Sequence, residues 1–160
     1  MRRQCGMDIT ITTLVLCCLV IASGPLAAQT QSSQSVLPSE NEDAIKNKEP
    51  AWELSAKKVK PDSTSYRWKL GEQQIDVHIY VTDSQDAAAA KLNEFAHYVP
   101  IPPKERLKSP GDEALLFQGV NTDECMILFR RGNVFVHLNG SSVADAKRFA
   151  KHLDDLFRPK

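Results

Sequence analysis

Alternating apolar and polar residues mark two neighbouring segments near the middle of the chain, residues 64–70 and 74–82. A period of two is typical of strands with one buried face. A four-residue loop between the segments keeps their apolar faces aligned, whereas a three-residue loop would set apolar against polar positions. The pairs predicted by the longer loop are Leu70 with Ile75, Trp68 with Val77 and Tyr66 with Ile79.

After residue 82 the apolar spacing changes from two to that of a helix. Asp83 or Ser84 can cap this helix, Asp86 suits its first turn, and four alanines favour helix strongly. The stripe expected to be buried consists of Ala88, Leu92, Phe95, Ala96 and Val99. Four prolines within residues 100–111 predict an exposed loop there rather than a strand.

Three further strands are predicted at residues 112–119, 124–130 and 133–139. The last two form a hairpin with Arg131-Gly132 as its turn, because glycine supplies the positive φ that such turns need. The pairs predicted by this turn are Phe129 with Val134, Ile127 with Val136 and Cys125 with Leu138. The opposite face carries Met126, Leu128 and Phe135, so both faces are largely apolar, as in strands covered on two sides.

A last helix follows, with Ser142 as its cap and Asp145 in capping-box position. Its buried stripe is predicted to consist of Ala146, Phe149, Ala150, Leu153 and Phe157. With a first strand at residues 52–60, the element order is (β)ββ-α-βββ-α. This predicts a single α+β domain over residues 51–160, with a mostly antiparallel sheet of five or six strands and two helices. Whether the helices share one face of the sheet or take one face each stays open.

The beginning of the chain has the pattern of a secretory signal peptide, residues 1–28. Arg2 and Arg3 precede an apolar stretch, and Ala28 offers a small residue for cleavage. The apolar stretch of fourteen residues, 9–22, is short for a membrane span, so no stable membrane anchor is expected. A periplasmic or secreted location follows. Residues 29–50 are rich in polar residues and predict a disordered linker.

Charge and cysteine content exclude several classes of protein. The chain has 20 Lys and Arg against 20 Asp and Glu, so no long-range field attracts nucleic acid, and none is expected as a partner. Three of its four cysteines lie in the predicted signal peptide, which leaves Cys125 without an intrachain partner. Its predicted strand face is apolar, and this favours a buried, unreactive thiol.

A sequence pattern in the second half of the chain resembles that of a group of small exported bacterial proteins of uncharacterised function. The pattern consists of Gly111-Asp112-Glu113-Ala114, Phe129-Arg130-Arg131-Gly132-Asn133-Val134 and a closing helix with Asp145-Ala146. The order of elements is also similar to the Mog1/PsbP-like fold. The resemblance implies that scaffold and a binding or accessory role, and it carries over no catalytic residues.

No motif for a nucleophile, phosphate loop, metal or redox centre is present, so no cofactor and no metal site are expected. The candidate binding residues are polar or basic side chains on predicted strands and on the proline-rich loop. They are Arg67, Asp76, His78, Tyr80, His137, Lys104 and Arg106.

Two functional classes remain. The chain is expected to be an exported, non-catalytic binding or accessory module whose partner is an unknown protein or a small ligand. The alternative is a small periplasmic hydrolase whose histidines and carboxylates meet only in space. A homodimer across the apolar hairpin is a further, purely structural alternative.

Overall fold

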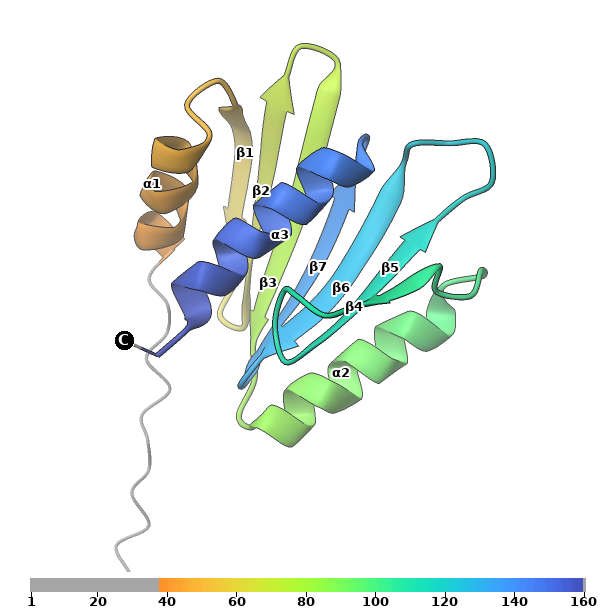
Figure 1. The fold of residues 1–160 in the computed structure, drawn as a ribbon. Helices are drawn as coiled ribbons and strands as arrows, with labels where there is room; N and C mark the ends of the chain where they lie inside the picture. The colour runs from red at the N-terminus through yellow and green to blue at the C-terminus, as the bar shows by residue number, and fades with distance from the viewer. Residues whose placement is uncertain (1–37, 160) are drawn as a thin grey trace, which may run out of the picture. The chain divides into compact units, whose positions relative to one another are not determined.

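The computed structural model describes residues 38–159, which form a seven-stranded antiparallel sheet with three helices. The strands are β1 (Glu53–Val59), β2 (Ser63–Leu70), β3 (Gln73–Val81), β4 (Glu105–Leu107), β5 (Glu113–Gln118), β6 (Cys125–Arg131) and β7 (Val134–Gly140). Their order across the sheet is β1-β2-β3-β7-β6-β5-β4, so the last strand of the chain lies between β3 and β6 (Figure 1).

The helices lie on opposite faces of this sheet. α3 (Val143–Phe157) packs on β6 and β7 from one face and also contacts α1 (Pro38–Lys48) (Figure 1). α2 (Gln85–Tyr98) packs on the same two strands from the other face. The α+β class is therefore confirmed, while the predicted count of five or six strands and two helices is too low. The predicted signal peptide, its cleavage after Ala28 and residues 29–37 lie outside the described residues.

A larger core fills the α3-side face of the sheet. Phe149 of α3 meets the buried Trp52 edge-on, with ring centroids 5.0 Å apart, and lies 6.3 Å from Trp68. A smaller core fills part of the α2-side face, where Ala88 and Leu92 contact the aromatic and aliphatic side chains of β5, β6 and β7. The predicted caps are confirmed, since the Ser84 and Ser142 hydroxyls each accept from a backbone N–H in the first turn.

The register of both hairpins differs from the prediction by two residues. Gly71, at φ +58°, and Glu72 form a two-residue turn between β2 and β3. Gly132, at φ +55°, and Asn133 form the one between β6 and β7. The observed pairs include Leu70 with Gln73, Trp68 with Ile75, Phe129 with Val136, and Cys125 with Gly140. The reason is that glycine at the first turn position matches the strand twist best in a two-residue loop.

α1 corrects the prediction of a disordered linker as far as residue 50. Ile45, on this otherwise polar helix, is 2% exposed and joins the larger core. At the end of the helix Glu49 accepts hydrogen bonds from Arg148 Nε at 2.5 Å and His152 Nε2 at 3.0 Å on α3. The composition of the segment gave no sign of order because the contacts that hold it come from residues about a hundred positions away.

β4 corrects the prediction that residues 100–111 form only a loop. Three residues without proline, Glu105–Leu107, pair with β5 at the edge of the sheet. An edge strand needs hydrogen bonds on one side only, so nearby prolines are tolerated there. Within residues 38–159, no helix is long and apolar enough to cross a membrane.

Candidate functional site

The α2-side face of the sheet is only partly covered, because α2 packs mainly on β6 and β7 and reaches β3 only at Tyr80. The uncovered part carries polar side chains in matched rows. Arg67 pairs with Asp76, Asp76 with Asn139, and His78 with His137 in the strand register. Five predicted site residues therefore share one face of β2, β3 and β7: Arg67, Asp76, His78, Tyr80 and His137.

Asp76 is the centre of a polar group on this face. Its Oδ1 accepts from Arg67 Nε at 2.7 Å, and its Oδ2 accepts from Gln74 Nε2 at 2.6 Å. Arg67 and Asp76 are thus paired across neighbouring strands, and the carboxylate is held in one orientation. The hydrogen bond and the charge of Asp76 raise the pKa of Arg67, which stays protonated.

His78 and His137 stack on each other with ring centroids 5.4 Å apart. A hydrogen bond of 2.8 Å joins His78 Nδ1 and Ser65 Oγ, and His137 Nε2 donates to Asn139 Oδ1 at 3.2 Å. Burial lowers the pKa of both histidines, and the charge of His78 lowers that of His137 further. Both rings are therefore neutral at pH 7 and add no positive charge to this face.

Tyr80 and the two remaining candidates have other roles. Tyr80 stacks on Phe135 and carries Lys91 Nζ 4.7 Å above its ring, next to α2. Lys104 and Arg106 lie at the β4 edge, far along the strand order from β2 and β3. Lys104 donates to Gln118 at 2.5 Å, and Arg106 pairs with Glu113 at 3.3 Å. The structure therefore does not bring these two together with the other five.

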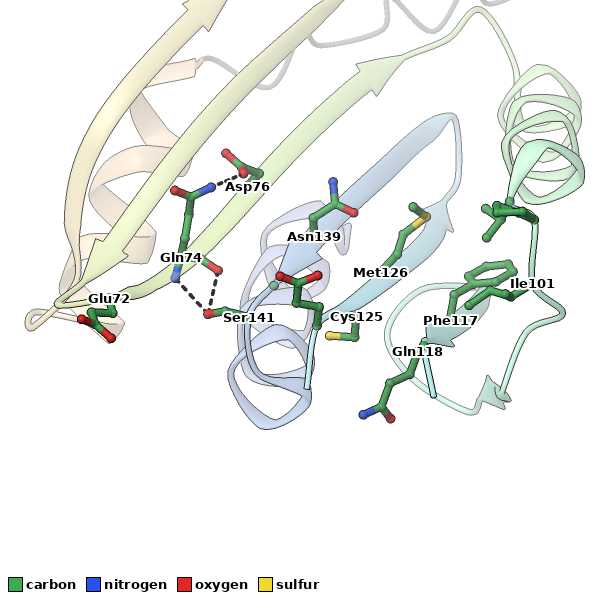
Figure 2. A pocket seen from close by; sticks show the side chains of 15 residues that line it. Glu72, Gln74, Asp76, Ile101, Phe117, Gln118, Cys125, Met126, Asn139 and Ser141 are labelled. Atoms are coloured by element: carbon green, nitrogen blue, oxygen red, sulfur yellow. Dashed lines mark hydrogen bonds between the residues drawn. The ribbon is translucent and has the colours of Figure 1, made fainter. Parts of the chain in front are cut away.

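An open cleft of about 580 Å³ lies beside the polar group. One register row crosses its floor from polar to apolar: Asp76, Asn139, Met126 and Phe117 are successive Cα partners on β3, β7, β6 and β5. The segment after α2 forms the apolar wall with Val99, Pro100 and Ile101. Figure 2 shows Asp76 and Gln74 on one side of the cleft, Ile101 and Phe117 on the other, and Met126 between them.

The polar end of the cleft is held by contacts between β3 and the turn after β7. The Ser141 hydroxyl accepts from Gln74 N at 3.0 Å and donates to the Gln74 carbonyl at 3.4 Å (Figure 2). Ser141 N donates to the same carbonyl at 3.1 Å. These bonds join strands that are distant in the sequence. The position of Asp76 relative to Asn139 is therefore fixed by the backbone.

Of the predicted site residues only Asp76 lines this cleft. The others that line it were missed because they come from the β2–β3 turn and the start of β3, from the ends of β5, β6 and β7, and from the loop after α2. The prolines after α2 predicted a loop there, but nothing in the sequence indicated that this loop lies across the cleft from β3. A second hollow of about 540 Å³ lies over the loop of residues 119–123 beside Lys104.

The chemistry of the described residues is limited. They hold no group of three or more His, Cys, Asp or Glu side chains that could bind a metal ion. Cys125 is buried, and burial raises the pKa of its thiol to about 11, so it is not a nucleophile at neutral pH.

The chain was compared with protein-family models, with curated proteins and with solved structures, and none of these comparisons gave a match.

Proposed function

We propose that the chain is an exported, non-catalytic binding module that takes up a small ligand in the cleft on the α2-side face. The observation that carries the proposal is the cleft itself, with Asp76 and Asn139 at one end of its floor and Met126 and Phe117 at the other. Its volume of about 580 Å³ lies within the range of ligand sites in proteins. Export rests on the signal-peptide pattern of residues 1–28.

The apolar wall provides a test of this proposal. Ile101 is 38% exposed, so Ile101→Ser removes apolar contact area for a ligand without opening the core. At about 25 cal/mol per Å², the loss of some 40 Å² of contact weakens binding about fivefold. Ligands are found by ligand-observed NMR with a fragment set that includes cations, neutral compounds and anions. Titration of each fragment that binds gives its Kd for the wild-type protein and for the variant.

Val120→Ser is the matched control. Val120 is 90% exposed, lines the second hollow and does not line the cleft. Its substitution is expected to leave every Kd unchanged. If no fragment binds, or if Ile101→Ser and Val120→Ser have the same effect, ligand binding in the cleft is wrong.

The alternative of a hydrolase has one observation in its favour, the 2.8 Å hydrogen bond between Ser65 and His78. A serine nucleophile also needs a group that orients the histidine and N–H donors for the oxyanion. The Asp76 carboxylate is engaged by Arg67 and Gln74, and His78 stacks on His137. β2 and β3 each have a neighbour on both sides, so their backbone N–H groups are used within the sheet.

Ser65→Ala tests the hydrolase alternative directly. We expect the wild-type protein and this variant to have the same, background-level rate on activated esters, because Ser65 and His78 lack an orienting carboxylate and N–H donors for the oxyanion. The assay measures release of nitrophenolate from nitrophenyl esters of short and long acids. A wild-type rate that falls at least about a hundredfold in the variant would establish a nucleophilic serine and overturn the non-catalytic proposal.

A homodimer across the β6–β7 hairpin has no support in the fold. Both faces of the hairpin are covered by the helices of the same chain, α2 on one side and α3 on the other. The resemblance to the Mog1/PsbP-like fold stays a prediction. It agrees with a binding or accessory role but does not carry the proposal.

A further inference from the structure

The cleft on the α2-side face has an uneven distribution of charge. Two exposed carboxylates line it, Glu72 in the turn between β2 and β3 and Glu124 just before β6. Asp76 is a third, but Arg67 neutralises it at 2.7 Å. No Lys, Arg or His is among the described residues that line the cleft. Its net charge is therefore negative and comes from Glu72 and Glu124.

Three cations near the cleft are engaged elsewhere, while Lys69, the register partner of Gln74 on β2, does not line the cleft. Arg67 is paired with Asp76, and Lys104 donates a hydrogen bond to Gln118. Lys147 lies close enough to Cys125 to act on its pKa, but its ammonium group pairs with Glu105 at 3.0 Å. His78 and His137, in the next register row, are neutral at pH 7 for the reasons given above. The two glutamates thus keep their charge available for a ligand.

Apolar surface lies within the same cleft as this charge. Val99, Pro100 and Ile101 form the wall, while Met126 and Phe117 form the apolar part of the floor. Ile101 is one of the few large apolar side chains that are exposed in the described part of the chain. A ligand that matches the whole cleft therefore has an apolar body and a positive charge at one end.

From this complementarity we propose that the ligand is an amphipathic organic cation, in which a protonated amine is attached to a hydrocarbon or aromatic body. This inference rests on the proposed function, since it names the ligand class for the same cleft. The ammonium group lies where the carboxylates of Glu72 and Glu124, on the rim of the cleft, attract it. The apolar body lies against Ile101 and Met126, where its burial supplies most of the affinity.

The test compares three probes with the same phenylbutyl body and different heads: 4-phenylbutylamine, 4-phenylbutanol and 5-phenylpentanoate. The protein is purified as the producing cell makes and processes it, without further truncation. NMR titration at pH 7 then gives a Kd for each probe. We expect the amine to bind about tenfold more tightly than the alcohol, since two partly screened charges act on it, and the acid to bind least tightly.

Two double variants separate local charge from overall charge. Glu72→Gln with Glu124→Gln removes the charge of the cleft but keeps Asp76 and its partners. We expect the amine to lose about fivefold to tenfold in affinity and the alcohol to keep its Kd. Glu53→Gln with Glu94→Gln changes the net charge equally at exposed sites on β1 and α2 that do not line the cleft, and no change is expected.

Each outcome bears on one proposal or the other. If the alcohol or the acid binds as tightly as the amine, or if both double variants act alike, the cationic ligand class is wrong while binding in the cleft stands. The same holds if other fragments bind the cleft but phenylbutylamine does not. If fragments of every charge fail to bind there, the proposed function itself is wrong.

Discussion

Replacement of Gly111 by alanine is expected to destabilise the fold by about 3 kcal/mol or more. Gly111 has φ +75°, and a Cβ on it would overlap the carbonyl oxygen of Arg130 and lie 3.1 Å from the Phe129 ring. That carbonyl also accepts from Asp112 N at 2.7 Å, so it cannot move without loss of this bond. Urea unfolding, followed by the fluorescence of the two buried tryptophans, measures the change.

Gly71→Ala is the matched control for this variant. Gly71 also has a positive φ, +58°, but a Cβ on it would meet nothing within 4 Å. Only the cost of the left-handed conformation applies there, about 1 kcal/mol. Equal losses in the two variants would show that the close approach of Gly111 to β6 does not restrict this position.

Asp154→Ala is expected to destabilise the fold by about 3 kcal/mol. The Asp154 side chain is fully buried, and Arg131 of β6 binds both its oxygens, at 2.7 and 2.9 Å. Arg158 adds a contact of 3.0 Å. In the variant the partly buried Arg131 keeps only one carboxylate partner, that of the more exposed Asp112. Asp155→Ala, at a more exposed surface pair, is the control and is expected to cost about 1 kcal/mol at most.

The pH dependence of this effect follows from the pKa of Asp154. Burial alone would raise that pKa, but hydrogen bonds from Arg131 and Arg158 outweigh burial and lower it below its ordinary value. The ion pair therefore stabilises the fold above about pH 4, and the contribution disappears as the pH falls through the lowered pKa. Urea titrations from pH 7 to pH 3 should show the gap between wild type and Asp154→Ala narrowing. A gap that widens in acid would contradict this assignment.

Local sequence signals predicted α2 and α3 well because caps and apolar spacing act within a few residues. Ser84 and Ser142 begin α2 and α3 as expected. The hairpin registers were wrong by two residues, since a shift of two leaves every side chain on the same face of the strand. The alternation therefore placed Arg67, Asp76 and His78 on one face correctly while it paired them with the wrong neighbours.

The remaining features depend on contacts that the sequence does not encode locally. α1 is ordered through Ile45 and Glu49, whose partners lie in the core and on α3. The cleft exists because β7 pairs with β3 and brings Asn139 beside Asp76. No local pattern in the sequence predicts that pairing, so the polar residues were predicted as a surface patch and the apolar wall opposite them was missed.

The most direct test of ligand binding in the cleft is residue-resolved NMR during a titration with phenylbutylamine. We expect the amide signals of Gly119, Met126, Asn139 and Ser141, which line the cleft, to shift together with a single Kd. Signals from β1 and from residues 120–123, which line the second hollow but not the cleft, should stay in place. Shifts that are confined to other surfaces, or the absence of any shift with fragments of every charge, would contradict a binding module built on this cleft.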